Sequence, residues 1–244
     1  MDEDILGFIA LEILAALSYC KAKNIIHRDV KPKNILLNRK GEVKLCDFGE
    51  SRFLIDSLAS TFVGTVDYWP PERFSDVDLP YDIRSDIWSF GITMLEIANG
   101  AYPFTNKDGK RSSHLHVPNT ITTTNMYELI HRCLTENYSM NFCEFVYHCV
   151  LELDVRPKTY DALMKRPFYV EHMSKKKEES AYMISTLLTT LIDKISGDDK
   201  ADTSGYVTAG KTLSEPIKSL SNITSESECD KVKMLAQSSQ ENKM

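Results

Sequence analysis

Apolar residues recur at helical spacing in several parts of the chain. Residues 4–22 show this spacing over their whole length, which predicts a helix with a broad buried face and Asp4 as its N-cap. Residues 25–26 follow as a short buried strand. Residues 84–99 are apolar nearly all round, which predicts a central buried helix that ends at Gly100. The same periodicity predicts shorter helices at 124–134, 140–152 and 158–165.

Two short apolar runs flank a polar turn and predict a β-hairpin. The runs cover residues 35–37 and 43–45, and Gly41 in the turn between them can supply a positive φ. A hairpin holds its two ends side by side. We therefore expect Asn34, just before the first strand, to lie close to Asp47, just after the second.

Other segments differ in pattern from these packed elements. Residues 50–73 have no clear periodicity and predict a long loop, and such loops in compact domains are usually functional. Residues 105–122 are polar and predict a surface loop or an insert, whereas residues 180–196 predict a strongly amphipathic helix. The predicted organisation is a mainly helical domain at 1–172, an amphipathic extension at 173–196 and a disordered tail, rich in Ser, Thr and charged residues, at 197–244.

The composition is that of a globular protein and narrows the function classes. Hydrophobic residues make up 42% of the 244 residues and charged residues 26%, and the net charge of -6 argues against a general nucleic-acid binder. The six cysteines include no Cys-x-x-Cys pair and no zinc-type Cys/His quartet, so we expect reduced thiols in the cytosol or the nucleus. No apolar run of about eighteen residues occurs and the start of the chain is acidic, so we expect neither a membrane span nor a signal peptide.

The most specific pattern in the chain is His-Arg-Asp-x-Lys-x-x-Asn at residues 27–34, followed by Asp-Phe-Gly at residues 47–49. This spacing is the phosphoryl-transfer constellation of protein kinases. Such a reaction needs a group that orients a hydroxyl, metal ions that bridge the phosphates, and positive charge near the transferred group. The alternative interpretation, two polar loops beside buried strands, leaves the coincidence of these residues unexplained.

The polar residues of this pattern suit those roles. Asp29 can orient a substrate hydroxyl and accept its proton, and Lys31 can reach the transferring phosphate. Asn34 and Asp47 offer the oxygen ligands that Mg²⁺ prefers.

The remaining residues of the pattern are interpreted as structural support. Phe48 is an apolar peg, and Gly49 permits the sharp turn that aims the preceding carboxylate. His27 is open to a catalytic or a structural interpretation. We favour the structural one, in which a packed histidine bridges the loop to the neighbouring strand.

The segment Asp56–Thr65 resembles the activation loop of MAP kinase kinases, which carry Ser-x-Ala-x-Ser/Thr here and are phosphorylated at the first and last positions by an upstream kinase. Ser57 and Thr61 match those positions, whereas Ser60 does not. The resemblance covers roughly residues 5–170. It implies a protein-kinase fold, ATP and Mg²⁺ as cofactors, a MAP kinase as the substrate phosphorylated on Thr and Tyr, and a MAP kinase kinase kinase as the upstream partner. Two further stretches share it, at 45–49 and 85–91.

The resemblance also implies roles for residues outside the catalytic pattern. Thr65 would bond near the catalytic Asp and Lys, and Asp86 would hold the backbone of the catalytic loop. Glu72 would pair with Arg156 and tie the activation segment to the later helices. Arg28 would meet the loop phosphate, since a guanidinium can bind a phosphate through two hydrogen bonds.

The chain also departs from the family pattern. Pro70, preceded by Trp69, stands where family members usually have Ala or Ser. Glu50 after Asp-Phe-Gly and the pair at 66–67 are also unusual, and these changes concern peptide selectivity. No Gly-x-Gly-x-x-Gly and no Val-Ala-x-Lys occurs, so we expect a mainly α protein-kinase C-lobe with its small β-hairpin, without the ATP-binding N-lobe. Two functions stay open: a kinase, or a catalytically dead decoy or scaffold that binds upstream kinases or MAP kinases.

Two further features each have two interpretations. Residues 205–212 fit the Walker A letters, but a polar acidic run precedes them and Pro216 would disrupt a following helix, so we do not expect a phosphate cradle. The helix at 180–196 can pack on the domain's own surface or serve as a docking helix for the upstream kinase. Deleting it and measuring binding of the upstream kinase distinguishes the two.

Overall fold

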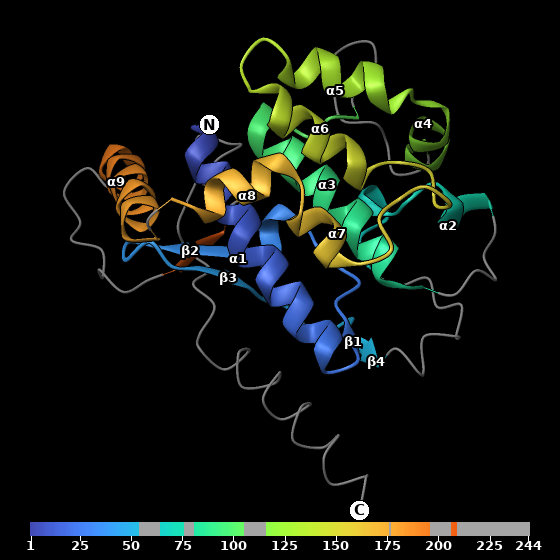
Figure 1. The fold of residues 1–244 in the computed structure, drawn as a ribbon, viewed down its shortest axis with the longest axis horizontal. Helices are drawn as coiled ribbons and strands as arrows, with labels where there is room; N and C mark the ends of the chain where they lie inside the picture. Colours follow the sequence, from blue (N-terminus) through green and yellow to red (C-terminus); the bar gives the residue numbers. More distant parts are fainter. Residues whose placement is uncertain (54–63, 76–80, 105–115, 176, 196–205, 209–244) are drawn as a thin grey trace, which may run out of the picture.

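The computed structural model describes residues 1–53, 64–75, 81–104, 116–175, 177–195 and 206–208, and it is mostly helical (Figure 1). The helices are α1 (Glu3–Ala22), α2 (Glu72–Ser75), α3 (Ile83–Asn99), α4 (Val117–Thr123), α5 (Met126–Leu134), α6 (Met140–Cys149), α7 (Tyr160–Met164), α8 (Pro167–Met173) and α9 (Lys177–Ile195). The strands are β1 (Ile25–Ile26), β2 (Ile35–Asn38), β3 (Val43–Leu45), β4 (Arg52–Phe53) and β5 (Tyr206–Thr208), with short 3-10 turns η1 (Pro32–Asn34) and η3 (Val66–Tyr68). In Figure 1, α3 lies near the centre, the hairpin and α9 lie at one end, and α2 and α4 lie at the other.

The first helix, α1, is confirmed, but its cap differs from the prediction. Asp2 is the N-cap, since its carboxylate accepts a hydrogen bond from the Asp4 N–H at 2.8 Å. Asp4 as the N-cap is wrong, because its own carboxylate binds His172 and Lys175. By length and composition α1 is apolar enough to cross a membrane. Most of its apolar side chains are instead buried in the domain core, where α1 contacts α3, α8 and α9.

The central helix is confirmed by α3. Asp82 caps its start by accepting a hydrogen bond from the Arg84 N–H at 2.7 Å. Gly100 ends it with a left-handed φ of 74°, and its N–H donates to the Glu96 carbonyl at 2.9 Å. Nearly every side chain of α3 between these caps is buried, which explains why the helix is apolar on all sides.

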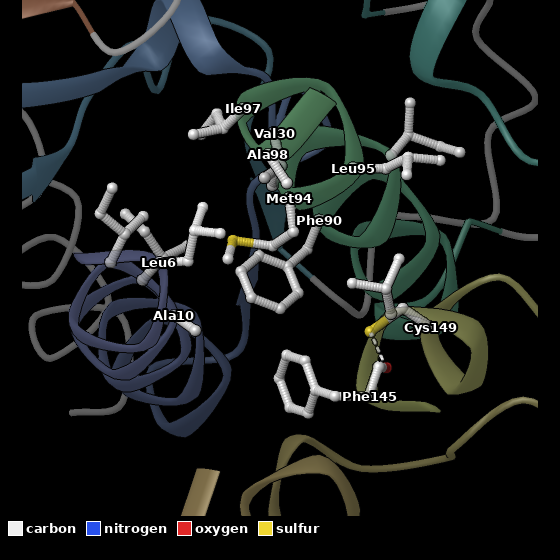
Figure 2. Close-up of a cluster of buried hydrophobic side chains, with 14 of the residues drawn as sticks. Leu6, Ala10, Val30, Phe90, Met94, Leu95, Ile97, Ala98, Phe145 and Cys149 are labelled. Carbon is white, nitrogen blue, oxygen red and sulfur yellow. Dashed lines mark hydrogen bonds between the residues drawn. The ribbon is translucent and has the colours of Figure 1, made fainter. Parts of the chain in front are cut away.

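The core forms where α1, α3 and α6 meet. Figure 2 shows Leu6 of α1, Phe90 of α3 and Phe145 of α6 pointing toward one another. The rings of Phe90 and Phe145 pack edge to face, with centroids 6.1 Å apart. Gly91 allows α3 and α6 to approach closely, because a Cβ at this position would lie 2.5 Å from the Cys149 Cβ. This packing holds α3 in place, and the loops near β1 and η1 pack against it.

The short strands organise the region that holds the predicted catalytic residues. β2 and β3 pair antiparallel, with Leu36 opposite Lys44, and Gly41 in the turn has a φ of 76°, so the predicted hairpin is confirmed. β1 pairs with β4. The sequence predicted a loop over residues 50–73, and this prediction is wrong for residues 52–53, which form β4. A two-residue strand carries too little periodicity to be recognised before its partner is known.

The predicted disorder of the tail is wrong for Tyr206–Thr208. These residues form β5, which pairs antiparallel with β2 and places Val207 opposite Leu37. The edge of β2 away from β3 offers unpaired backbone groups, and pairing with β5 satisfies them. The other tail residues lie outside the described part of the chain.

The predicted shorter helices are present, but α2, α4 and α8 were not predicted. α5, α6 and α7 confirm the three shorter helices, with small shifts at their ends. α4 lies inside the predicted surface loop, so that prediction is wrong for residues 117–122, while residues 105–115 lie outside the described residues. Val117 and Ile121, one turn apart on α4, are both buried, and this contact stabilises a helix that the polar composition concealed.

The amphipathic helix at 180–196 is confirmed as α9. Ile184 and Leu188 are fully buried, and α9 packs on α1 and β2. The turn of the hairpin touches the same helix, since a Cβ on Gly41 would lie 2.1 Å from the Ala181 carbonyl oxygen. The apolar face of α9 therefore faces the domain's own core, and a docking role for this helix stays a prediction.

Candidate active site

Asp29 lies at the centre of a hydrogen-bond network. Lys31 Nζ lies 2.5 Å from Asp29 Oδ2 and 2.7 Å from Thr65 Oγ1. Thr65 donates to Asp29 Oδ1 through its N–H at 3.0 Å and its hydroxyl at 2.8 Å. Burial alone would raise the pKa of Asp29, but hydrogen bonds from Lys31 and Thr65 outweigh burial and the pKa is lowered. The carboxylate is therefore charged and held in place at neutral pH.

The two oxygen donors predicted for Mg²⁺ lie at adjacent ends of the hairpin. The Cys46 N–H donates to the Asn34 carbonyl at 2.9 Å, which places Asp47, the next residue, beside Asn34 as predicted. Asn34 Nδ2 donates to the carbonyl and Oδ2 of Asp29 at 2.7 and 3.0 Å, so its Oδ1 is the atom that can face a cation. No group of three or more His, Cys, Asp or Glu that could hold a metal occurs among the described residues. A cation here would take further oxygen ligands from a phosphate and water, as Mg²⁺ commonly does.

His27 is fully buried and joins the catalytic loop to the end of β3. Its Nε2 lies 3.1 Å from the Cys46 carbonyl oxygen, and its Nδ1 accepts from the Asp29 N–H at 3.3 Å. Both contacts fit one neutral tautomer with its proton on Nε2. Burial lowers the pKa of His27, which favours this neutral form. Its ring also packs edge-on against Phe48, with centroids 4.7 Å apart, and these contacts support the structural interpretation.

Two residues of the site have left-handed backbone although neither is glycine. The φ of Arg28 is 73° and that of Asp47 is 63°. Such conformations are costly for residues with a side chain and concentrate at functional sites. The turn that aims Asp47 therefore has its left-handed residue at Asp47 itself rather than at Gly49. Gly49 instead leaves space, because a Cβ there would lie 3.2 Å from Asp47 Oδ1.

Asp86 holds the backbone of the catalytic loop from α3. Its fully buried carboxylate accepts from the N–H groups of His27 and Arg28, each at 2.9 Å. The hydroxyls of Tyr81 and Tyr160 approach the same carboxylate at 3.0 and 3.5 Å. Burial raises the pKa of Asp86 against the effect of these donors. The two backbone hydrogen bonds stabilise Arg28 in its left-handed conformation and so aim the following Asp of the loop.

Glu72 and Arg156 form the ion pair that the resemblance implies. Arg156 Nη1 and Nη2 lie 2.7 and 3.0 Å from Glu72 Oε1 and Oε2, a bidentate geometry. Arg156 also donates to the carbonyls of Leu151 and Arg84, and its guanidinium lies 5.0 Å from the Trp88 ring centroid. The pair thus ties α2, which follows the Thr65 segment, to the loop after α6.

Arg28 has a buried side chain whose guanidinium lies over Tyr81, at 5.1 Å from the ring centroid. Arg73 lies over the same ring at 5.7 Å. Burial lowers the pKa of Arg28. Ser57 and Thr61, the predicted phosphorylation sites, lie outside the described residues. The contact between Arg28 and a phosphate therefore stays a prediction.

Two residues of the site were not singled out from the sequence. Gly64 has a φ of 97°, and a Cβ there would lie 2.5 Å from the Arg28 carbonyl oxygen, so only glycine allows Thr65 to reach Asp29. Tyr81 joins the Asp86 carboxylate to the Arg28 guanidinium. A glycine in a polar loop and an aromatic residue before a helix are both common. Neither residue could therefore be recognised from the sequence as part of the site.

The Walker A letters do not form a phosphate cradle in the described residues. Residues 206–208 of that motif form β5 and pair with β2, whereas a cradle needs a loop whose N–H groups surround a phosphate. Gly205 and residues 209–212 lie outside the described part of the chain. Strand pairing in the middle of the motif argues against nucleotide binding there.

Comparison with known proteins agrees with this geometry. The protein kinase domain model matches residues 1–195. The chain is 51% identical over 107 residues to the MAP kinase kinase MKK1/SSP32 of Saccharomyces cerevisiae. The matched part is 44% of this chain and 21% of that relative, so the chain spans about a fifth of the length of the curated relative it matches.

Proposed function

Since the chain belongs to the protein kinase family and, within it, to the MAP kinase kinases, we propose that it carries the catalytic loop of an enzyme that phosphorylates a MAP kinase. The phosphate donor is ATP, and the acceptors are Thr and Tyr hydroxyls in the activation loop of the substrate. The observation that carries the proposal is the network that joins Asp29, Lys31, Thr65 and Asn34. A packed core does not require so many polar contacts around one buried carboxylate.

ATP and Mg²⁺ fit the donors present. Asn34 Oδ1 and the Asp47 carboxylate are hard oxygen donors at neighbouring ends of the hairpin, and they would hold Mg²⁺ together with phosphate oxygens. The bound ion would neutralise charge on the phosphates during transfer.

The protein's own residues would orient the substrate hydroxyl and accept its proton. Asp29 orients the substrate hydroxyl and accepts its proton as the phosphate is transferred. Lys31, 2.5 Å from Asp29 and 2.7 Å from Thr65, supplies positive charge beside the reacting oxygen. Thr65 donates twice to Asp29 Oδ1, and Lys31 and Asn34 donate to Oδ2, so both carboxylate oxygens are held in place for the substrate hydroxyl.

Activation is part of the proposal. Phosphorylation of Ser57 and Thr61 by a MAP kinase kinase kinase would order the loop before Thr65, with Arg28 meeting the phosphate. The backbone support for this idea is that Asp86 holds Arg28 in a left-handed conformation beside Asp29. We also propose that the protein works in the cytosol or the nucleus, without binding nucleic acid or a membrane.

The substitution Asp29→Asn tests the catalytic role. In a form of the protein that binds ATP, we expect kcat to fall by about 10²- to 10⁴-fold, since general-base catalysis contributes on this order. Asn keeps an acceptor for Thr65 but loses the carboxylate that pairs with Lys31, so the thermal midpoint should fall while near-ultraviolet circular dichroism shows that the fold is kept. The matched control is Asp161→Asn, at an exposed position on α7. Full activity of Asp29→Asn would refute the assignment.

A second function is favoured by the missing sequence patterns. The 244 residues contain no glycine-rich phosphate loop and no strand lysine of the kinase type, so this chain by itself could act as a decoy or scaffold for upstream kinases or MAP kinases. We expect no phosphate transfer from radiolabelled ATP to a MAP kinase by the 244-residue chain. Transfer that Asp29→Asn abolishes would exclude the scaffold function.

A further inference from the structure

A groove of about 730 Å³ lies beside the active-site segment and is not used by the chemistry described above. Residues of α3, α4, α5 and α6 and of the segment 150–155 line it, and Pro71 and Glu72 form one end. Glu72 begins α2, the element that follows the Thr65 segment. The groove therefore adjoins the segment that carries Thr65, whose N–H and hydroxyl donate to Asp29.

A buried hydrogen-bond donor lies in the wall of this groove. The Trp88 side chain is nine-tenths or more buried, and its Nε1–H has no acceptor among the described residues. The indole nitrogen can only donate, and a buried donor without a partner destabilises the structure that contains it. Arg156 occupies a face of the same ring, at 5.0 Å from its centroid, and does not satisfy the N–H. The Trp88 ring lines the groove, so its Nε1–H is a sensitive reporter of a partner that binds there.

Large apolar side chains stand exposed at the rim. Tyr127 is 62% exposed and Val155 is 67% exposed, and both line the groove. Met126 and Tyr147 line it as well and are partly buried. An exposed aromatic residue beside a preformed apolar groove is the usual composition of an anchor site for another protein.

The charges of the groove are negative. Among the residues that the structure describes, its charged lining residues are Glu72 and Glu152, and no Lys, Arg or His lines it. Arg156 compensates Glu72, whereas Glu152 and the neighbouring Asp154 are exposed. A segment that carries a cation next to an apolar side chain is therefore complementary to this surface.

We propose that this groove docks the protein substrate of the kinase, through a segment with an aromatic or aliphatic side chain next to a Lys or Arg. The apolar side chain packs between Tyr127 and Val155 near the Trp88 ring, and the cation faces Glu152. The inference rests on the proposed function, because the groove's place beside Glu72 identifies the occupant as the molecule presented to Asp29.

The first test observes Trp88 directly. The chain has two tryptophans, so a sample labelled with ¹⁵N at the indole gives two Nε1–H signals, and Trp69→Phe assigns them. The labelled 244-residue chain is titrated with each member of a panel of unphosphorylated MAP kinases. We expect the Trp88 signal to move when a MAP kinase binds. A Trp88 signal that stays in place in a bound complex overturns the inference.

The second test compares the affinity of groove variants with matched surface variants. Tyr127→Ser and Val155→Asp should each raise Kd for the MAP kinase by about tenfold or more. Met140→Ser and Met173→Ser are the controls, since these side chains are 67% and 61% exposed and do not line the groove. The controls should change Kd by less than about twofold. Near-ultraviolet circular dichroism checks that all four variants are folded.

The charge is tested in the same way. Glu152→Lys should raise Kd by about tenfold, and binding should weaken as salt is added. Glu136→Lys, an exposed position outside the groove lining, is the control. Equal Kd for groove variants and controls overturns this docking site and leaves the proposed function intact. If no MAP kinase binds the chain at all, the proposed substrate is wrong and the docking inference falls with it.

Discussion

Replacing Glu72 by Gln isolates the buried ion pair that anchors the segment after Thr65. The Glu72 carboxylate accepts hydrogen bonds from both terminal nitrogens of the Arg156 guanidinium, at 2.7 and 3.0 Å. The Arg156 side chain is fully buried. Gln has nearly the same shape, so the substitution removes charge and one acceptor without opening a cavity. Arg156 keeps its hydrogen bonds to the Leu151 and Arg84 carbonyls.

The expected loss in the free energy of unfolding depends on the Arg156 charge, which stays buried after the Glu72 charge is removed. Removing one partner of a buried ion pair costs about 3–5 kcal/mol, because the other charge is left buried without compensation. Two carbonyl acceptors and the Trp88 ring still stabilise Arg156, which places the expected loss in the free energy of unfolding near the lower end, at about 3 kcal/mol. With a urea m-value of roughly 2 kcal/mol/M, the unfolding midpoint would fall by about 1.5 M.

The assay is urea unfolding of the 244-residue chain, followed by tryptophan fluorescence, since Trp88 lies against Arg156. The matched control is Asp82→Asn, which removes the charge from the partly exposed pair with Arg84 and keeps the N-cap oxygen of α3. That control should cost less than about 1 kcal/mol. A loss for Glu72→Gln no larger than that of the control would refute the claim that this buried pair stabilises the domain.

Two further predictions concern His27 and α9. Burial lowers the pKa of His27 below its value in the unfolded chain, so its contribution to stability is present above about pH 6.5 and is lost as the pH falls through the lowered pKa. An NMR titration should give His27 a midpoint below 6.5, with the proton of the neutral ring on Nε2, toward Cys46, and an ordinary titration midpoint would contradict this. Ile184→Ala, in the buried face of α9, should lower the free energy of unfolding by about 2–5 kcal/mol. Tyr182→Ser, at a position 72% exposed on the same helix, should change it by no more than about 0.5 kcal/mol, and equal effects would contradict the packing of α9 on the core.

The candidate catalytic residues of this protein could be recognised in the local sequence. Asp29, Lys31 and Asn34 lie within six residues of one another, and a short hairpin brings Asp47 beside Asn34, so proximity along the chain already implied proximity in space. The long helices could also be predicted from the sequence, because apolar residues recur at helical spacing over many residues.

The remaining contacts of the site join distant segments. Thr65 reaches Asp29 across 36 residues and Arg156 reaches Glu72 across 84, and the residues alone did not show either pairing. Only the resemblance to MAP kinase kinases led us to expect them. Their geometry depends on how α3 and the later helices pack, which no local pattern encodes.

The sequence by itself determined the candidate catalytic residues, the hairpin and the main helices, since each is specified within a short stretch of chain. The tertiary structure decided that Tyr206–Thr208 pair with β2, that α9 covers the core, and that Trp88 lies in a groove beside α2. These features depend on which strand edge and which apolar face lack a partner after the rest has folded. That is a property of the assembled surface, because burial and open edges exist only once distant segments have come together.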